Sequence, residues 1–453
     1  MTDIIPAEIL AKYGDAVPRY TSYPTAPHFQ DGLGGALLEN SLAGLSAEDR
    51  VSVYVHIPFC DRLCWFCGCH TKHTLQYEPV EAYIDSLIEE IGIIGKKMPS
   101  KPILAQLHLG GGSPSMVRSE DFARISDALH ENFNFDADTE ISVEIDPSDI
   151  NENALAGLKE LGLTRASIGV QDFDPQVQAA INRPQTFEQT RDVVSALRGI
   201  GANSLNIDAL YGLPLQSADR LEQTIDKVVS LSPDRVALFG YAHIPWIKKH
   251  QRLINEADLP GTSDRYSHAR LAGSQLSAAG YEEIGIDHFA LPDDALACYA
   301  REGKLRRNFQ GYTTDNCSLL IGLGASSIGK TKTGYVQNIV PTGQYSQCVK
   351  SGQLPAKRGL ILSEDDKIRA HIIERLMCDF HFSFADMETR FGLSALPHVE
   401  VAQKLAAEDT DGLCGADDEM FYVKYGAKSF TRIVASRFDA YLKNSQFRYS
   451  KAI

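Results

Sequence analysis

The hydrophobic pattern between residues 51 and 241 alternates short apolar runs with longer stretches of helical periodicity. The short runs are apolar on both faces, which is typical of parallel strands that helices cover. We therefore predict six strands, at residues 51–57, 103–109, 139–145, 165–171, 204–212 and 235–241. Strand–helix units in series form parallel barrels, and six units are too few to close one. The pattern predicts an α/β fold with an open, partial (β/α)6 parallel barrel.

Helix start and stop signals support the segments between these strands. Thr186 and Gln189 form a capping box, and a leucine stripe at positions 155, 158 and 161 ends at Gly162. After residue 363 the pattern is mostly helical, with one predicted hairpin at 421–426. We predict an N-terminal segment with one weak helix (1–47), a barrel with its extension (48–360) and a small winged-helix-like C-terminal domain (361–453).

Composition narrows the class of protein. The 453 residues can bury a full core, and no apolar run approaches the roughly 20 residues of a membrane span. A formal charge of −15 argues against a nucleic-acid partner, because phosphate binding requires a basic surface. The first residues lack the basic-then-apolar profile of an export signal. We expect a cytoplasmic enzyme that binds no membrane, and a monomer by default.

Four cysteines lie within ten residues of one loop, at positions 60, 64, 67 and 69. The spacing C-x3-C-x2-C of the first three can place thiolates on three corners of a cubane iron–sulfur cluster and leave the fourth iron open. Structural zinc is the alternative, but zinc modules usually carry two separated C-x2-C pairs, and only Cys64 and Cys67 form one. A disulfide knot is disfavoured in a cytosolic chain. The aromatic side chains Phe59, Trp65 and Phe66 would shield the sulfurs from water.

Chemically distinctive residues follow each predicted strand, where parallel barrels place their active sites. They are the cysteine loop, the run GGGSPS (110–115), Glu144, Gln171, Asp208 and Tyr241-Ala242-His243. Taken alone, GGGSPS is also compatible with a tight turn and Glu144 with a surface carboxylate. Asp208 stands in an apolar strand, so it requires a partner; a salt bridge with Arg183 or Arg165 competes with a binding role.

The cysteine motif followed by a GGG-x-P loop resembles the radical S-adenosylmethionine (SAM) superfamily. Further strings between residues 18 and 442 resemble the oxygen-independent coproporphyrinogen III oxidases (dehydrogenases): PRYTSYPT, YVHIPFC, CGC, EIDP, SIGVQDF, YAHIP, IGIDHFA, RNFQGYTT and FDAYL. The departures are Ser113 and Ser115 for Thr, Trp65 for Tyr, and His70 for an Asn. His70 either alters access to the cluster or simply lies at the surface, which we favour.

The resemblance implies an activity. Cys60, Cys64 and Cys67 would hold a [4Fe-4S] cluster that cleaves SAM to methionine and a 5′-deoxyadenosyl radical. The radical would take a hydrogen atom from a propionate side chain of coproporphyrinogen III, and loss of CO2 and one electron would leave a vinyl group. Two rounds give protoporphyrinogen IX in haem biosynthesis. An electron donor of flavodoxin or ferredoxin type and an unidentified terminal acceptor would be partners.

The resemblance also implies roles for single residues. Contacts to the cluster-bound SAM would come from Tyr54, Gly111, Glu144 and Ile328, and contacts to a second SAM from Phe66, Gly112, Ser113, Gln171, Arg183, Asp208 and Ala242. Cys69 matches a cysteine that is required but does not bind the cluster. The PRYTSYPT segment would fold over the site, where Arg19 either meets a substrate carboxylate or is simply solvated.

Two alternatives stay open at this point. A related haem chaperone shares the loop and the barrel, but it typically lacks the fourth cysteine and the PRYTSYPT segment. A zinc-stabilised winged-helix regulator is the alternative from another class, and the acidic charge and the rim residues argue against it.

Overall fold

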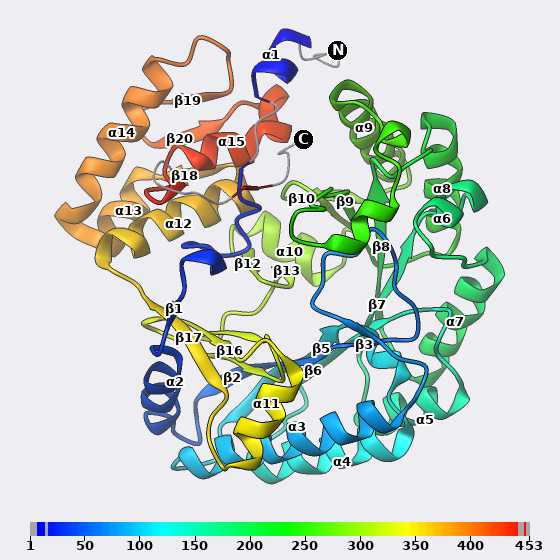
Figure 1. The fold of residues 1–453 in the computed structure, drawn as a ribbon. Helices are drawn as coiled ribbons and strands as arrows, with labels where there is room; N and C mark the ends of the chain where they lie inside the picture. The colour runs from blue at the N-terminus through cyan, green and yellow to red at the C-terminus, as the bar shows by residue number, and fades with distance from the viewer. Residues whose placement is uncertain (1–6, 14–16, 443–447, 450–453) are drawn as a thin grey trace.

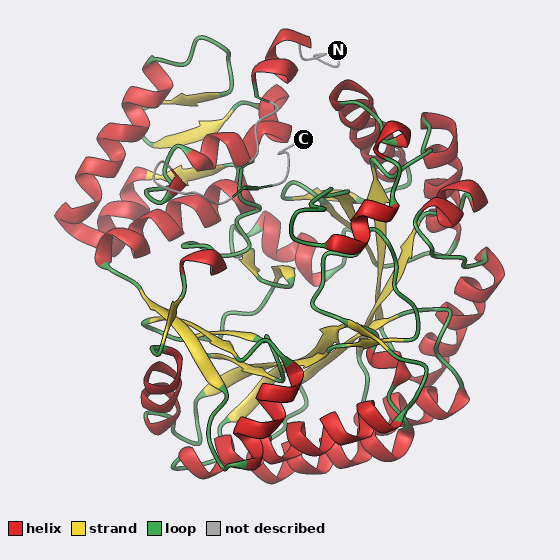
Figure 2. Cartoon of the chain, viewed as in Figure 1, coloured by secondary structure: helices red, strands yellow, loops and turns green. Residues whose placement is uncertain are grey.

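The computed structural model describes residues 7–13, 17–442 and 448–449. Within these residues, a curved sheet of 13 strands runs in the order β1-β17-β16-β15-β14-β2-β5-β6-β7-β8-β9-β11-β10. Figure 1 shows the sheet as an arc with helices on its outer side, and Figure 2 shows the strands lining the inner side.

All six predicted strands are present, and each is parallel to its neighbour in chain order. They are β2 (Arg50–Ile57), β5 (Ile103–Gly111), β6 (Glu140–Ile145), β7 (Arg165–Gln171), β8 (Ser204–Tyr211) and β9 (Arg235–Gly240). The two edge strands of the large sheet, β1 and β10, do not pair with each other, so the barrel is open as predicted.

Helices cover the outer face of this arc (Figure 1). They are α3 (Glu78–Lys97), α4 (Ser119–Asn132), α5 (Glu152–Leu161), α6 (Pro175–Ala180), α7 (Phe187–Ile200), α8 (Ala218–Ser230) and α9 (Thr262–Ala278). The predicted end signals are confirmed. Gly162 ends α5 in the left-handed conformation at φ 83°, and Thr186 and Gln189 form the capping box of α7.

The sheet extends beyond the six predicted strands on both sides. β14 (Leu320–Leu323) adds a seventh parallel strand beside β2, and its four residues are too short a run to be recognised by periodicity. Antiparallel strands complete the two ends: β15 (Ile328–Lys330), β16 (Gly334–Asn338), β17 (Ala356–Ile361) and β1 (Gln30–Asp31), with β11 (His288–Ala290) and β10 (Glu282–Ile284) beyond β9. α10 (Ala295–Arg301), α11 (Thr342–Lys350) and the β12–β13 hairpin (Arg306–Asn308, Gly311–Thr313) lie in the same extension.

The C-terminal part is mostly helical and packs on a small antiparallel sheet. It contains α12 (Glu364–Asp379), α13 (Phe384–Phe391), α14 (Leu396–Ala407), α15 (Thr431–Ser436) and the strands β18 (His381–Ser383), β19 (Cys414–Ala416) and β20 (Met420–Val423). The predicted hairpin is displaced. Residues 420–423 form only its second strand, which pairs with β19, because the chain enters a 3-10 helix at Tyr425.

The described residues of the N-terminal segment contain two α-helices, α1 (Ala7–Lys12) and α2 (Gly34–Ala43), and a short 3-10 helix (Ala26–His28), where one helix was predicted. Two glycines at the start of α2 weaken its propensity, and burial of Leu38 and Leu42 in the barrel core compensates. No helix in the described part of the chain is long and apolar enough to cross a membrane.

Candidate active site

The cysteine loop follows β2 and is held from both sides. It begins at β3 (Phe59–Cys60), which pairs with β4 (Lys72–His73). On one side, the Trp65 amide donates to the Ile181 carbonyl at 2.9 Å. On the other, the segment after β9 supplies two bonds: Lys248 Nζ donates to the Cys69 carbonyl and His250 Nε2 to that of Cys67, both at 2.8 Å. The loop is therefore tied to the barrel rim.

The four thiols of this loop are free, and Cys64 is the buried one. Burial raises the pKa of Cys60 to about 12, and the neighbouring Cys67 and Cys64 thiolates add to the shift. Hydrogen bonds from Cys69 lower the pKa of Cys67 to about 7; the Cys69 amide lies 3.3 Å from the Cys67 sulfur. The sulfurs are thus close enough to interact and differ in their ease of ionisation.

Arg183 provides a buried positive charge at the same loop. Its Nη1 donates to Cys64 Sγ at 3.4 Å and to Asp146 Oδ2 at 2.9 Å, and its Nη2 donates to the Gly169 carbonyl at 2.6 Å. Asp146 and the Cys64 thiolate outweigh the cost of burial and raise the pKa of Arg183. The guanidinium therefore stays charged against a thiol that sequence spacing assigns to the cluster.

The glycine run has no room for side chains. A Cβ on Gly112 would lie 2.6 Å from the Phe59 nitrogen, and one on Gly111 would overlap the His56 ring. Gly111 also has a φ of +109°, which other residues rarely adopt. The amides of Gly112 and Ser113 donate to the carbonyls of Ile57 and Phe59 at 2.9 and 2.6 Å. The run lies directly against the start of the cysteine loop, which explains its composition.

Glu144 is held by hydrogen bonds while its side chain stays 40% exposed. Its Oε2 accepts from the Gly111 amide at 3.0 Å, and its Oε1 lies 3.4 Å from His108 Nε2. Burial opposes ionisation, but the bonds and charge of His108 and the Gly111 amide together lower the pKa of Glu144. A carboxylate that is charged and held beside a glycine cradle can bind hydroxyl or ammonium groups.

Tyr54 joins this arrangement through two histidines. Its ring stacks on His108 at a centroid distance of 5.8 Å, and its hydroxyl lies 2.9 Å from His56 Nδ1. His56 Nε2 donates to the His70 carbonyl at 3.0 Å, so Nδ1 is the acceptor for Tyr54. Burial lowers the pKa of His56 to about 4, which keeps this tautomer neutral. His70 itself is only partly exposed, and its Nε2 atom is buried.

Asp208 shows no salt bridge to Arg183 or Arg165, so the competing structural interpretation is wrong. Arg165 pairs with Glu140 instead, at 2.8 Å. Asp208 accepts from Asn206 Nδ2 at 2.7 Å and from Ser167 Oγ at 3.1 Å. Burial, followed by the charge of Glu144, raises the pKa of Asp208 to about 6. The Asp208 carboxyl, which has no salt-bridge partner among the described residues, therefore lines the cavity inside the barrel.

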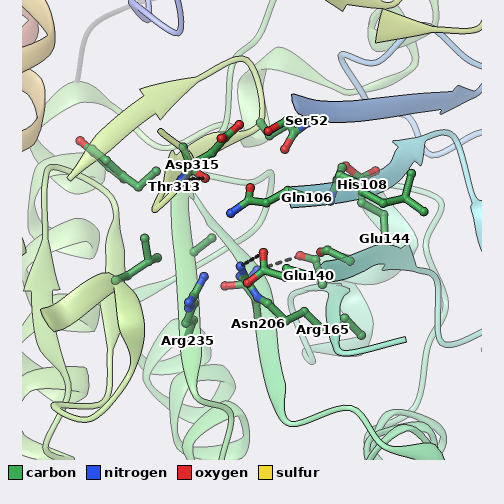
Figure 3. A pocket seen from close by; sticks show the side chains of 18 of the residues that line it. Ser52, Gln106, His108, Glu140, Glu144, Arg165, Asn206, Arg235, Thr313 and Asp315 are labelled. Atoms are coloured by element: carbon green, nitrogen blue, oxygen red, sulfur yellow. Dashed lines mark hydrogen bonds and ion pairs between the residues drawn. The ribbon is translucent and has the colours of Figure 1, made fainter. Parts of the chain in front are cut away.

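A polar cavity of about 210 Å³ lies inside the sheet below this rim (Figure 3). Asp208, Glu144 and His108 belong to its lining, and Ser52, Gln106, Glu140, Asn206 and Arg235 line its deeper part. The Oδ1 atom of Asn206 and the Oγ atom of Ser52 are buried without a partner among the described residues. Such atoms in a polar cavity are places for bound water.

The other predicted site residues lie around the same rim. Ile328 begins β15, and its backbone approaches Gly322, which is paired with Tyr54. Gln251 links Phe66 to Ala242 by donating to both carbonyls, at 2.8 and 3.2 Å. Gln171 ends β7 in the left-handed conformation at φ 69°. The predicted residues therefore converge from several strands, although their individual binding roles stay predictions.

Sequence reasoning missed several groups that shape the site. His56, His108 and Asp146 lie beside predicted residues, as described above. Asp149 accepts from Ser115 at 2.6 Å, and burial and the charge of Asp146 raise its pKa to about 7. The family strings were a usable signal for two of these groups, since His56 belongs to YVHIPFC and Asp146 to EIDP.

The arrangement of the loop fits a cubane cluster better than zinc. Three thiols on a short loop, with a guanidinium hydrogen bond to one sulfur and aromatic neighbours, suit a cluster that presents one open iron.

Comparison with known proteins agrees with this site. The model of the radical SAM superfamily matches residues 54–228. A Cereibacter sphaeroides protein named oxygen-independent coproporphyrinogen III oxidase is 43% identical over 452 residues, 100% of both chains. A protein of that name from Pseudomonas aeruginosa is 38% identical, covering 99% of this chain and 98% of its own. The solved coproporphyrinogen III oxidase of Escherichia coli, described as a radical SAM enzyme, has a TM-score of 0.90 at 37% identity and covers 97% of this chain and 100% of its own.

The open parallel barrel and its cysteine loop thus define a radical SAM enzyme. Within that superfamily, identities of 43% and 37% over nearly the full length of both chains show the family. The chain belongs to the oxygen-independent coproporphyrinogen III oxidase family.

Proposed function

We propose that this chain oxidatively decarboxylates two propionate side chains of coproporphyrinogen III to vinyl groups, giving protoporphyrinogen IX. The observation that carries the proposal is the full-length match to coproporphyrinogen III oxidases, 43% identical in one case and with a TM-score of 0.90 in another. Each propionate loses one hydrogen atom, one CO2 and one electron. The electron leaves to a terminal acceptor that stays unidentified.

The proposed cofactors are a [4Fe-4S] cluster on Cys60, Cys64 and Cys67 and SAM on its open iron. Bound together, they supply a 5′-deoxyadenosyl radical that takes hydrogen from carbon. The protein contributes binding and exclusion of water rather than acid–base chemistry. Gly111 has no side chain because the His56 ring fills that space, and Glu144 offers a charged acceptor beside its amide. Tyr54 on β2 and Ile328 on β15 flank β14, which pairs with both strands, and would lie in reach of the same ligand.

A second SAM is proposed at the same rim. Its contacts would be Phe66, Gly112, Ser113, Gln171, Arg183, Asp208 and Ala242. Gln251 connects Phe66 and Ala242, and the Gly169 backbone lies beside both Arg183 and Gln171, which supports a common site. Cys69 is proposed as an essential residue that does not bind the cluster. Its exposed position next to Cys67 is compatible with contact to a reactant.

The three-part domain division also stays a proposal, with residues 1–47 folded over the site. Arg19 Nη2 donates to the Gly240 carbonyl at 2.7 Å, at the end of β9, which supports it. A reduced flavodoxin or ferredoxin type donor, a cytoplasmic location and a monomeric state belong to the same proposal. Residues 1–6, 14–16, 443–447 and 450–453 of these parts lie outside the described residues.

The related haem chaperone is the second candidate. The chain carries both features that it typically lacks, the fourth cysteine and the PRYTSYPT segment. The packing of that segment on the rim through Arg19 favours the oxidase. A zinc-stabilised regulator is disfavoured because the chain is similar over its full length to coproporphyrinogen III oxidases.

The test is an anaerobic assay of reconstituted protein with reductant, SAM and coproporphyrinogen III. Cell extract supplies the terminal acceptor, and porphyrins are separated by chromatography after oxidation while 5′-deoxyadenosine is counted. We expect protoporphyrin together with deoxyadenosine, and neither from a Cys64→Ala control. Deoxyadenosine without a vinyl product, from protein with an intact cluster, would reject the oxidase in favour of another substrate or haem transfer.

A further inference from the structure

Three arginines lie near one carboxylate at the barrel rim, and a fourth lies beside two of these arginines. The carboxylate is Asp287, just before β11, and the arginines come from the N-terminal segment (Arg19), α9 (Arg265), β12 (Arg307) and α15 (Arg432). We call these four residues the arginine cluster. Arg307 Nη1 lies 3.8 Å from Asp287 Oδ1, and Arg432 and Arg19 are near enough for their charges to interact with Asp287.

The cluster carries more positive charge than Asp287 can balance. Burial and then the charge of Arg432 lower the pKa of Arg19 to about 10, and Arg265 adds to the effect. Burial and Arg432 lower the pKa of Arg265 as well. Asp287 is already hydrogen-bonded to His288 Nδ1 at 2.8 Å. Mutually repelling arginines are costly to bury unless an anion joins them.

Arg307 has unused hydrogen-bonding capacity. Its side chain is 5% exposed, and its Nε and Nη1 have no hydrogen-bond partner among the described residues. The guanidinium lies 4.5 Å over the ring of Tyr312, which fixes its plane. It also lines a cavity of about 450 Å³ that residues 20–23 help to enclose, with six arginines and lysines but only one carboxylate, Glu374, in the lining. Buried guanidinium donors without partners point to an anionic ligand.

The cluster lies close to the reacting part of the site. Asp208 on β8 pairs with Ala237 on β9, and Ala237 pairs with His288 on β11. Two strand spacings of about 4.8 Å place His288, and Asp287 next to it, roughly 10 Å from Asp208. His288 lines the same cavity as Asp208 and Glu144. Arg19 is anchored on this rim through the Gly240 carbonyl.

We propose that the arginine cluster binds a propionate carboxylate of the substrate, one that is not reacting, and so holds the macrocycle while another propionate is oxidised. The inference rests on the proposed function, because the substrate class supplies the carboxylates: coproporphyrinogen III has four. A planar guanidinium can hold a carboxylate through two parallel N–H bonds. The strings RNFQGYTT and IGIDHFA, which contain Arg307 and Asp287, thereby acquire a role.

The experiment compares Arg307→Gln and Arg432→Gln with Arg301→Gln, an exposed arginine of α10 that pairs with Glu282. Binding of oxidised coproporphyrin III is titrated without SAM, followed by its absorbance and fluorescence, and KM for coproporphyrinogen III is measured separately. The neutral tetra-amide of the same porphyrin is the second probe. Lysine variants at positions 307 and 432, and the cluster content of each protein, control for misfolding.

We expect Arg307→Gln and Arg432→Gln to weaken binding of the tetra-acid by about tenfold to a hundredfold, as for loss of a charged hydrogen bond. KM should rise more than kcat falls, the lysine variants should restore part of the affinity, and tetra-amide binding should change little. Unchanged tetra-acid binding, or an equal loss for both probes, would overturn the inference. Absence of vinyl product from the wild type would instead reject the proposed function. The porphyrin titration would still show whether the arginine cluster binds a carboxylate.

Discussion

At the scale of single residues, two arginines share one carboxylate beside the cysteine loop but differ in one contact. Arg183 and Arg62 both pair with Asp146, at 2.9 and 3.3 Å. Arg183 alone of the two donates to a thiol, Cys64 Sγ. A hydrogen bond and a positive charge at a cluster sulfur favour the reduced, more negative state of the cluster. The pair therefore offers a matched test of how the protein sets the potential.

We predict that Arg183→Gln lowers the midpoint potential of the cluster by tens of millivolts. Since 59 mV in a one-electron couple corresponds to about 1.4 kcal/mol, this is the range expected for one charged contact. Arg62→Gln is the control and should shift the potential much less. A redox titration followed by electron paramagnetic resonance measures both. Equal shifts in the two variants would mean that the effect passes through Asp146 and not through the sulfur.

At the scale of elements, a buried carboxylate on α3 joins this helix to the β14–β15 turn, to β16 and to α11. Glu90 accepts from the Gly324 amide at 2.7 Å, from Asn338 Nδ2 at 2.7 Å and from the Tyr345 hydroxyl at 2.6 Å. Its side chain is fully buried. The helix thereby holds the turn between β14 and β15, which ends at Ile328. Glu90 acts on the proposed SAM contact only through this turn.

The pKa of Glu90 gives this link a pH dependence. Burial raises it from 4.5 to about 7 despite the three hydrogen bonds. A raised carboxyl pKa stabilises the folded state at low pH, and this contribution is lost as pH rises from 4.5 through 7. Between pH 5.5 and 8.0 the wild type should therefore lose about 2 kcal/mol more than Glu90→Gln, at 1.36 kcal/mol for each pKa unit.

Anaerobic urea unfolding of both proteins at the two pH values, at equal cluster content, measures this difference. Glu89→Gln, which alters the neighbouring residue on α3, serves as the control and should show the pH dependence of the wild type. Parallel pH profiles for the wild type and Glu90→Gln would contradict the assignment of the titration to Glu90.

The elements that the sequence predicts are those whose signal is local. The six strands, the capping box at Thr186 and the glycine end at Gly162 follow from residues close together in the chain, and the structure confirms them. β14 escapes prediction because four apolar residues have no measurable period. The pairing of Asp208 escapes it as well, because Asn206 and Ser167 are ordinary strand residues whose contact depends on strand register.

The residues of the site likewise fall into those that the sequence predicts and those that it does not. The cysteine loop, the glycine run and Glu144 are visible as motifs at strand ends. The arginine cluster is not, because its members are separated by up to 413 positions, from Arg19 to Arg432. Only the packing of the N-terminal segment and α15 beside β11 brings their charges together. Sequence reasoning thus finds groups on one strand end and misses groups that meet across parts of the chain.

At the scale of the whole molecule, the N-terminal segment joins two separate cores. Leu10, Val17, Tyr20 and Tyr23 pack in the core of the C-terminal part, while Phe29 packs on the barrel extension. The Tyr20 hydroxyl donates to Asp439 Oδ2 at 3.0 Å, and β1 pairs with β17. The barrel core contains none of the described residues before Leu38. Cluster binding and closure of the site should therefore depend on different parts of the chain.

We predict that a chain lacking residues 1–31 still assembles the cluster but loses porphyrin turnover. The cysteine loop belongs to the barrel, whose core keeps its residues, so iron, sulfide and visible absorption should match the wild type. Removal of four buried side chains from the C-terminal core should loosen α12 and α15, because large-to-small changes in a core cost several kcal/mol. Hydrogen exchange should then rise in these two helices and not in α4, which packs against α3 and α5 on the barrel.

A chain lacking only residues 1–6 keeps every contact named here and is the control. Loss of the cluster in the longer truncation, or retained turnover, would show that the segment does not separate the two roles.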